Sequence, residues 1–281
     1  MSRRVPSIVR TAHLFRPLHS ALIELLRGLP DDTWNLHVGA GEWTVRDVAA
    51  HLLDGDLRRI SVDRDGHPPP PPDRPITGYG DLLAYLNGLN AQWTNAARRI
   101  SPRLLVELLE NTGVTLATLM ESAMLEGDAT FPVSWAGQQR SPMWLDIGRE
   151  YTERWHHQDQ IRDATGVAPL THPDLLRPVI DVSLLALPHA LASVGRPDGT
   201  AVSIDASGPA GGSWHLECRD GTWLLADGSA PDADARLAAS DLNVARLLLH
   251  RLPNDRIGEL VRTEGDGELT GALTRARAVM V

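Results

Sequence analysis

The sequence contains no lysine and only one cysteine, Cys218. A single cysteine excludes an internal disulfide framework and every metal site that needs several thiolates. Such cysteine usage is typical of a reducing compartment, and we expect a cytoplasmic protein. Cys218 itself lies in a predicted strand, where we expect a small, buried side chain. Arginine supplies all the permanent positive charge, and arginine is the better clamp for carboxylates.

Long apolar runs and blocks of positive charge are also missing. The most apolar stretch, residues 179–194, is interrupted by Asp181, Pro188 and His189, so it is a poor membrane span. Basic residues likewise interrupt the N-terminal region where a signal peptide would need a continuous apolar segment. The formal net charge of −9 argues against a general nucleic-acid binder. We therefore expect small-molecule partners, with no nucleic acid and no membrane.

Several catalytic signatures are absent as well. The chain has no His-Glu-x-x-His, no Gly-x-Ser-x-Gly, no Gly-Lys phosphate loop and no Cys-x-x-Cys pair. The glycine clusters at 39–41 and 208–212 do not complete a dinucleotide fingerprint, so we interpret them as turns. These absences leave the histidines and acidic residues as the main source of chemistry.

The first 168 residues have the pattern of a helical domain. Apolar residues recur at helical spacing over 7–29, 44–63, 81–100, 101–125 and 141–165. Thr44 stands three residues before Asp47, and Ser-Pro pairs begin at 101 and 141; both are signals of helix starts. The proline run at 65–73 predicts an extended connection between helices.

The remaining residues, 169–281, predict a smaller α+β domain. A helix over 175–194 is followed by alternating apolar and polar residues at 200–206, 212–219, 221–226 and 233–239, which predict strands. Asp220-Gly221 is a strong hairpin signal between two of them. Helices are predicted over 241–250 and 268–277, with a further strand over 256–264.

One helix of the first domain carries the most informative spacing. Glu153 and His157 are four residues apart, which puts both side chains on one face of a helix, where they can share one cation. His51, on the predicted helix over 44–63, is the best candidate for a third ligand. The same spacing also fits a surface ion pair, and His51 could equally be a solvated histidine. We expect Asp146 and Glu150 to be exposed charges.

These residues carry a family resemblance. The stretch from Trp43 to Leu52, together with Glu153-x-x-x-His157 and the helix end at Gly166, resembles the mycothiol-dependent maleylpyruvate isomerase family of the DinB-like metal-binding superfamily. The second half resembles that family's sterol-carrier-like α+β domain, at 212–214, 220–223, 247–251 and 264–269. The resemblance implies a DinB-like four-helix bundle over 1–168 followed by a smaller sterol-carrier-like domain over 169–281.

The resemblance also implies a chemistry. His51, Glu153 and His157 would bind a divalent metal, most often Zn²⁺, and the thiol cosubstrate would be mycothiol. Two imidazoles and one carboxylate leave a coordination position open, and a thiol that enters it is deprotonated. An arginine of the second domain, Arg251 or Arg262, would clamp a substrate carboxylate. The implied activity is an S-transferase or a cis–trans isomerase acting on a small electrophilic substrate.

Two other functions remain open from the sequence. The first is a metal-dependent hydrolase that uses an activated water in the open position. The second is a non-enzymatic protein that binds a metal or a small ligand. Turnover without added thiol would indicate the first, and ligand binding that survives His51→Ala and His157→Ala would indicate the second.

Overall fold

The computed structural model describes residues 8–39, 41–137 and 140–279. Ser7 of the first predicted helix and Ala40 of a predicted turn lie outside these ranges. The described residues form two compact units. The helical unit comprises 12–124 and 153–169, and the sheet unit comprises 8–11, 125–152 and 170–279. Helix α5 (Met143–Thr165) contributes to both units, and the predicted domain boundary after residue 168 stays a prediction.

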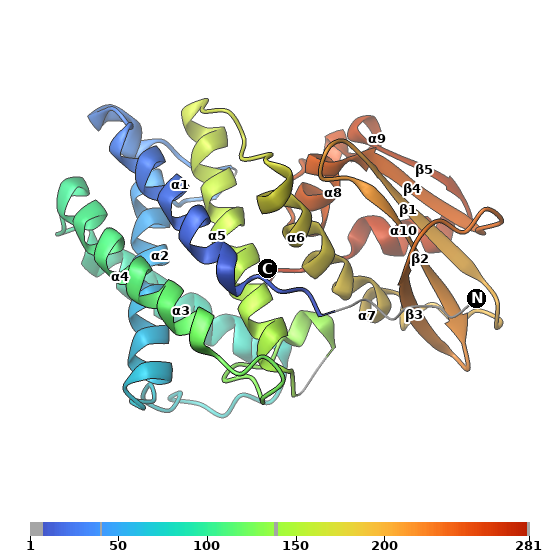
Figure 1. The fold of residues 1–281 in the computed structure, drawn as a ribbon, viewed down its shortest axis with the longest axis horizontal. Helices are drawn as coiled ribbons and strands as arrows, with labels where there is room; N and C mark the ends of the chain where they lie inside the picture. The colour runs from blue at the N-terminus through green and yellow to red at the C-terminus, as the bar shows by residue number, and fades with distance from the viewer. Residues whose placement is uncertain (1–7, 40, 138–139, 280–281) are drawn as a thin grey trace. The chain divides into compact units, whose positions relative to one another are not determined.

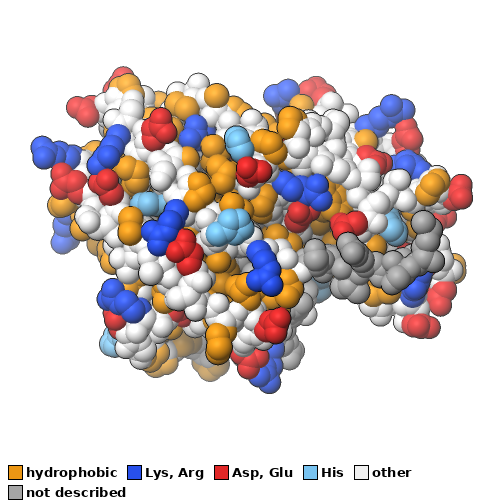
Figure 2. All heavy atoms as spheres, viewed as in Figure 1, with side chains coloured by type: hydrophobic (Ala, Val, Ile, Leu, Met, Phe, Trp, Pro, Cys, Tyr) orange, Lys and Arg blue, Asp and Glu red, His pale blue; other side chains and the backbone are white. Residues whose placement is uncertain are grey.

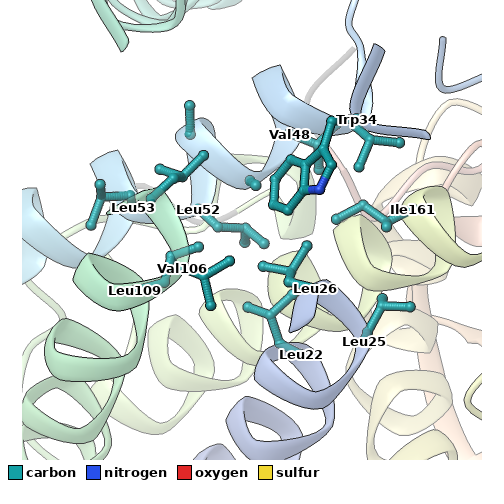
Figure 3. Packing of buried hydrophobic residues seen from close by; sticks show 14 of the residues in the cluster. Leu22, Leu25, Leu26, Trp34, Val48, Leu52, Leu53, Val106, Leu109 and Ile161 are labelled. Carbon is teal, nitrogen blue, oxygen red and sulfur yellow. The ribbon is translucent and has the colours of Figure 1, made fainter. Parts of the chain in front are cut away.

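The helical unit is a bundle, as predicted. Its other helices are α1 (Phe15–Arg27), α2 (Val45–Arg59), α3 (Tyr79–Ala97) and α4 (Pro102–Ser122). Helices α1, α2, α4 and α5 lie side by side in Figure 1. Their apolar faces meet in one buried cluster, to which Leu22, Leu52, Leu109 and Ile161 each contribute from a different helix (Figure 3). This cluster gives the helical unit a hydrophobic core of its own. Burial of apolar surface is the main term that stabilises a folded protein.

Local signals fix where these helices begin. Thr44 and Asp47 form a reciprocal capping box at the start of α2, because each side chain accepts a hydrogen bond from the other residue's backbone N–H. Ser101 caps α4 by accepting from the backbone of Leu104, with Pro102 at the first helical position. Helix α2 continues into a short π turn over Ile60–Arg64. The residues at 65–73 are exposed and belong to no helix or strand.

The sheet unit contains a mixed five-stranded sheet in the order β3-β2-β1-β4-β5. Strands β1 and β4 are parallel, and every other neighbouring pair is antiparallel. Alternate residues such as Ile204, Leu216 and Leu237 are buried, and α7, α8 and α10 pack against the sheet. The elements are α6 (Pro173–Ser183), α7 (Leu187–Leu191), β1 (Ala201–Ser207), β2 (Gly212–Arg219), β3 (Thr222–Asp227), β4 (Ala235–Ser240), α8 (Asp241–Leu248), α9 (Ile257–Leu260), β5 (Val261–Gly265) and α10 (Gly267–Arg275).

The predicted hairpin is confirmed between β2 and β3. Asp220 and Gly221 have φ angles of 49° and 71°, which are the positive values that a two-residue turn of this type requires at both central positions.

Three predicted elements differ from the structure. The helix over 7–29 begins only at Phe15, after a 3-10 turn at Ala12–Leu14. The helix over 175–194 is divided into α6 and α7 by a 3-10 turn at Leu184–Ala186, and Pro188 lies in the first turn of α7. The strand over 256–264 is wrong in its first half, where α9 replaces it. Ile257 and Leu260 are three residues apart, so these apolar residues suit one helical turn better than a strand.

None of the described helices is both long and apolar enough to cross a membrane. On the face shown in Figure 2, acidic and basic side chains are interspersed.

Candidate metal centre

His51 lies in the second turn of α2, and the chain before that helix builds one wall beside it. The backbone of Val38 donates to Trp43, and that of Val45 donates to Leu36, so the approach to α2 folds back on itself. The Trp43 ring consequently lies 5.0 Å from the His51 ring and 6.4 Å from the His157 ring, centroid to centroid. An indole over both imidazoles reduces their access to water.

The three predicted ligands converge within the helical unit. One possible ligand atom from each of His51, Glu153 and His157 lies within 4.8 Å of the other two. His157 Nε2 is 3.4 Å from Glu153 Oε2, and the His51 and His157 rings meet edge to face with centroids 4.7 Å apart. A simple surface ion pair within α5 would need no histidine from α2. The convergence of all three side chains therefore favours a site in which they bind one cation.

Gln160 orients the His157 ring from one turn further along α5. His157 Nδ1 and Gln160 Oε1 are 2.7 Å apart, and because the amide oxygen only accepts, Nδ1 carries the proton. The lone pair of the neutral ring is then on Nε2, which faces Glu153. A hydrogen bond of this kind on the distal nitrogen is the usual support of a metal-binding histidine.

His51 is held in its neutral form. Burial lowers the pKa of His51 to about 3, and the nearby His157 ring and Arg58 guanidinium act in the same direction. Glu153 and the Asn90 side chain oppose the shift. Trp93 of α3 donates to Ala50 O at 2.7 Å, which holds α3, and with it Asn90, against α2.

The residues present fit a divalent cation. Two ligand atoms at about 2.1 Å from a tetrahedral ion lie about 3.4 Å apart, and the pair His157 and Glu153 matches this separation. Nδ1 of His51 is buried and has no hydrogen-bond partner among the described residues, so one nitrogen of a neutral ring lacks a protein partner. Two imidazoles with one carboxylate are a donor set of catalytic zinc sites.

The two predicted arginines belong to the sheet unit. Arg251 follows α8, is half-buried, and its backbone N–H donates to Arg246 O. Arg262 lies in β5 with an exposed side chain that pairs with Glu264 at 2.5 Å, and it borders a shallow hollow beside Asp205. The three candidate ligands belong to the other unit, so the role of either arginine stays a prediction.

Asp146 and Glu150 were expected to be exposed, and this is wrong. Asp146 is completely buried and Glu150 is 8% exposed. Arg149 pairs with both carboxylates, at 2.7 Å and 3.5 Å, which compensates for the loss of water. Cys218 is buried as expected, and its thiol donates to Arg196 O.

The sequence interpretation missed three residues near the site. Gln160 was detectable, because it stands three residues after His157 on the same helix face. Arg58 was detectable as well, because it stands seven residues after His51 on the same face of α2. Asn90 carries no local signal, since its relation to His51 depends on the packing of α3 against α2.

The sequence model of the mycothiol maleylpyruvate isomerase N-terminal domain matches residues 15–162, which is more than half of the chain. No curated protein sequence matches the chain.

Among solved structures, the crystal structure of the mycothiol-dependent maleylpyruvate isomerase and that of a histidine-to-alanine variant of it are both similar to this chain. Each is 13% identical, covers 90% of this chain and 91% of its own, and has a TM-score of 0.54. Sterol carrier protein 2 from Yarrowia lipolytica covers 49% of this chain and 91% of its own at 16% identity, but its TM-score of 0.24 is too low to support an argument. The predicted family and fold class are confirmed, and the family supports the prediction of an enzyme.

Proposed function

The chain belongs to the mycothiol maleylpyruvate isomerase N-terminal domain family, and from this premise we propose that it is a metal-dependent enzyme with mycothiol as its thiol cosubstrate. The observation that carries the proposal is the convergence of His51, Glu153 and His157, from two helices, with ligand atoms within 4.8 Å of one another. The metal is Zn²⁺ or a similar divalent ion, because imidazole and carboxylate ligands suit it.

Each residue of the centre has a definite task. His51 and His157 present neutral imidazoles and Glu153 a carboxylate, and Gln160 keeps the His157 tautomer that leaves Nε2 available. Trp43 covers one side of both imidazoles and restricts water. When bound, the ion supplies the chemistry of lowering the pKa of a thiol that reaches it.

The cysteine content of the chain agrees with a thiol that comes from outside the protein. The only cysteine of the chain is buried in β2, in the sheet unit, so it is a poor nucleophile for an incoming substrate. The mycothiol sulfur would add to an activated double bond of a small electrophile. Rotation about the resulting single bond and expulsion of the thiolate make an isomerase. Retention of the sulfur, with uptake at the neighbouring carbon of the proton that the thiol gave up, makes an S-transferase.

The structural relative is named for maleylpyruvate isomerisation, so maleylpyruvate is the first substrate to test. We propose an electrophile that carries a carboxylate, clamped by Arg251 or Arg262. A charge-assisted, two-point contact between a guanidinium and a carboxylate would fix the orientation of such a substrate.

Elemental analysis tests the metal. Because the three proposed ligands form one site, purified protein should contain about one divalent ion per chain. Glu153→Ala should lose that ion. Glu121→Ala is the matched control, because Glu121 pairs with Arg16 on the surface of the same unit and should leave the ion in place. A chain that purifies with no divalent ion and takes none up would refute the metal site.

Thermal unfolding tests the thiol. Mycothiol should raise the melting temperature of the metal-loaded protein and leave that of the chelator-treated protein unchanged. If it raises neither, thiol dependence is refuted. Turnover in the absence of any thiol would instead indicate a hydrolase.

A further inference from the structure

A buried ionic network joins the two helices that carry the candidate ligands. Asp56 of α2 is completely buried, and Arg154 of α5 is 4% exposed. Nη2 of Arg154 donates to one carboxylate oxygen of Asp56, and Thr112 of α4 donates to the other at 2.6 Å. The guanidinium also lies 5.9 Å from the ring centroid of Phe15 in α1. The Asp56 carboxylate therefore ties α2, α4 and α5 together, and its partner Arg154 lies against a fourth helix, α1.

Stability is a weak explanation for such a network. Removal of two charges from water costs several kcal/mol for each ion, and apolar side chains of similar volume often replace buried ion pairs without loss. Burial lowers the pKa of Arg154 to about 10, which reflects this cost. The best-attested use of a buried ion pair is to specify how helices align.

The network lies close to the candidate ligands on both helices, where the alignment of α2 with α5 sets the distances between the ligands. Arg154 directly follows Glu153 and precedes His157 by three residues. Asp56 follows His51 by five residues, a rise of about 7.5 Å along α2. A helix is rigid over that distance, so a displacement of α2 against α5 at Asp56 and Arg154 displaces His51 against His157 by a similar amount.

We propose that Asp56, Arg154 and Thr112 are positioning residues that set the spacing of the metal ligands between α2 and α5. This inference rests on the proposed function. The planar guanidinium gives the contact a direction that apolar packing lacks, and the threonine hydroxyl fixes the orientation of the carboxylate. The three side chains thereby determine where His51 stands relative to Glu153 and His157, without any of them being a ligand.

The test replaces the pair with apolar residues of similar volume in the full chain. The double variant Asp56→Leu/Arg154→Met removes both charges, so neither is left buried alone. Arg98→Leu is the control: it removes the ion pair between Arg98 and Asp47, which involves α2 but not α5. Thr112→Val removes only the hydroxyl. The measurements are Zn²⁺ affinity by chelator competition, the absorption spectrum of bound Co²⁺, and the melting temperature of the metal-free protein.

The expected result separates binding from stability. The double variant should keep a metal-free melting temperature at least as high as that of Arg98→Leu, bind Zn²⁺ about 10-fold to 100-fold more weakly, and show an altered Co²⁺ spectrum. Zn²⁺ affinity and a Co²⁺ spectrum equal to those of Arg98→Leu would overturn the inference.

A double variant that does not fold leaves the decision to Thr112→Val. Weaker Zn²⁺ binding by that variant at unchanged melting temperature supports the positioning role, and unchanged binding overturns it. If the unaltered chain binds neither Zn²⁺ nor Co²⁺, the proposed function itself fails and the positioning role fails with it. If instead the unaltered chain and the variants all bind Zn²⁺ equally well, only the positioning role is refuted and the proposed function stands.

Discussion

Removal of the Gln160 amide should weaken metal binding without unfolding the chain. In Gln160→Leu, His157 Nδ1 loses the acceptor that lies 2.7 Å away. The ring is then free to carry its proton on either nitrogen, and the tautomer with a proton on Nε2 cannot bind a metal through that atom. We expect the Zn²⁺ dissociation constant to rise about 10-fold to 100-fold, the range for lost support of a metal-binding histidine.

The free-energy cost of Gln160→Leu also follows independently from the burial of His157. His157 is only 7% exposed, so water replaces the lost acceptor poorly. A buried donor left without a partner costs about 1–3 kcal/mol. A 10-fold to 100-fold loss corresponds to about 1.4–2.8 kcal/mol. The two ranges overlap, which is expected if the neutral ring with Nδ1–H is the form that binds the metal.

Chelator competition at fixed pH measures the dissociation constant directly. Gln160→Glu is the matched control, because it keeps an acceptor at the same place and should bind Zn²⁺ at least as tightly as the unaltered chain. A Gln160→Leu variant that binds Zn²⁺ within twofold of the unaltered chain would refute the reasoning, since the orientation of His157 would then not depend on this contact.

Three further predictions concern stability, each measured by thermal or urea unfolding. Gly113→Ala should lower the free energy of unfolding by about 1–3 kcal/mol, because the new Cβ would lie 2.1 Å from the His19 ring, whereas Gly88→Ala, with open space in α3, should raise it by about 0.5–1 kcal/mol. Gly221→Ala should cost about 1–2 kcal/mol, because φ at that position is 71°. Burial, assisted by Arg154, lowers the pKa of His19, so the unfolded chain binds more protons and stability should fall as pH drops below about 6.5; His19→Asn should reduce that dependence and leave the part due to His51, whose pKa burial also lowers.

Equal stability of the two alanine variants would show that His19 moves aside without cost. A Gly221→Ala variant as stable as the unaltered chain would mean that the turn changes type. An unchanged pH dependence after His19→Asn would assign the acid sensitivity to other groups.

The sequence by itself determined the local structure of this protein. The helix starts at Thr44 and Ser101, the turn at Asp220 and the pairing of Glu153 with His157 all depend on residues within a few positions of one another. Backbone conformation and side-chain periodicity act over that range, so a pattern of residues is sufficient to predict them.

Only the tertiary structure decided which faces meet. The proximity of His51 to His157, the burial of Asp146, and the pairing of Asp56 with Arg154 each join segments, or depend on packing, that no local spacing encodes. Periodicity identifies the residues that share a face of one helix, but the packing of one helix on another is set by the summed shape of many side chains. For this reason the ligands, and Gln160 beside His157, could be named from the sequence, while the contacts between helices that set the spacing of the ligands could not.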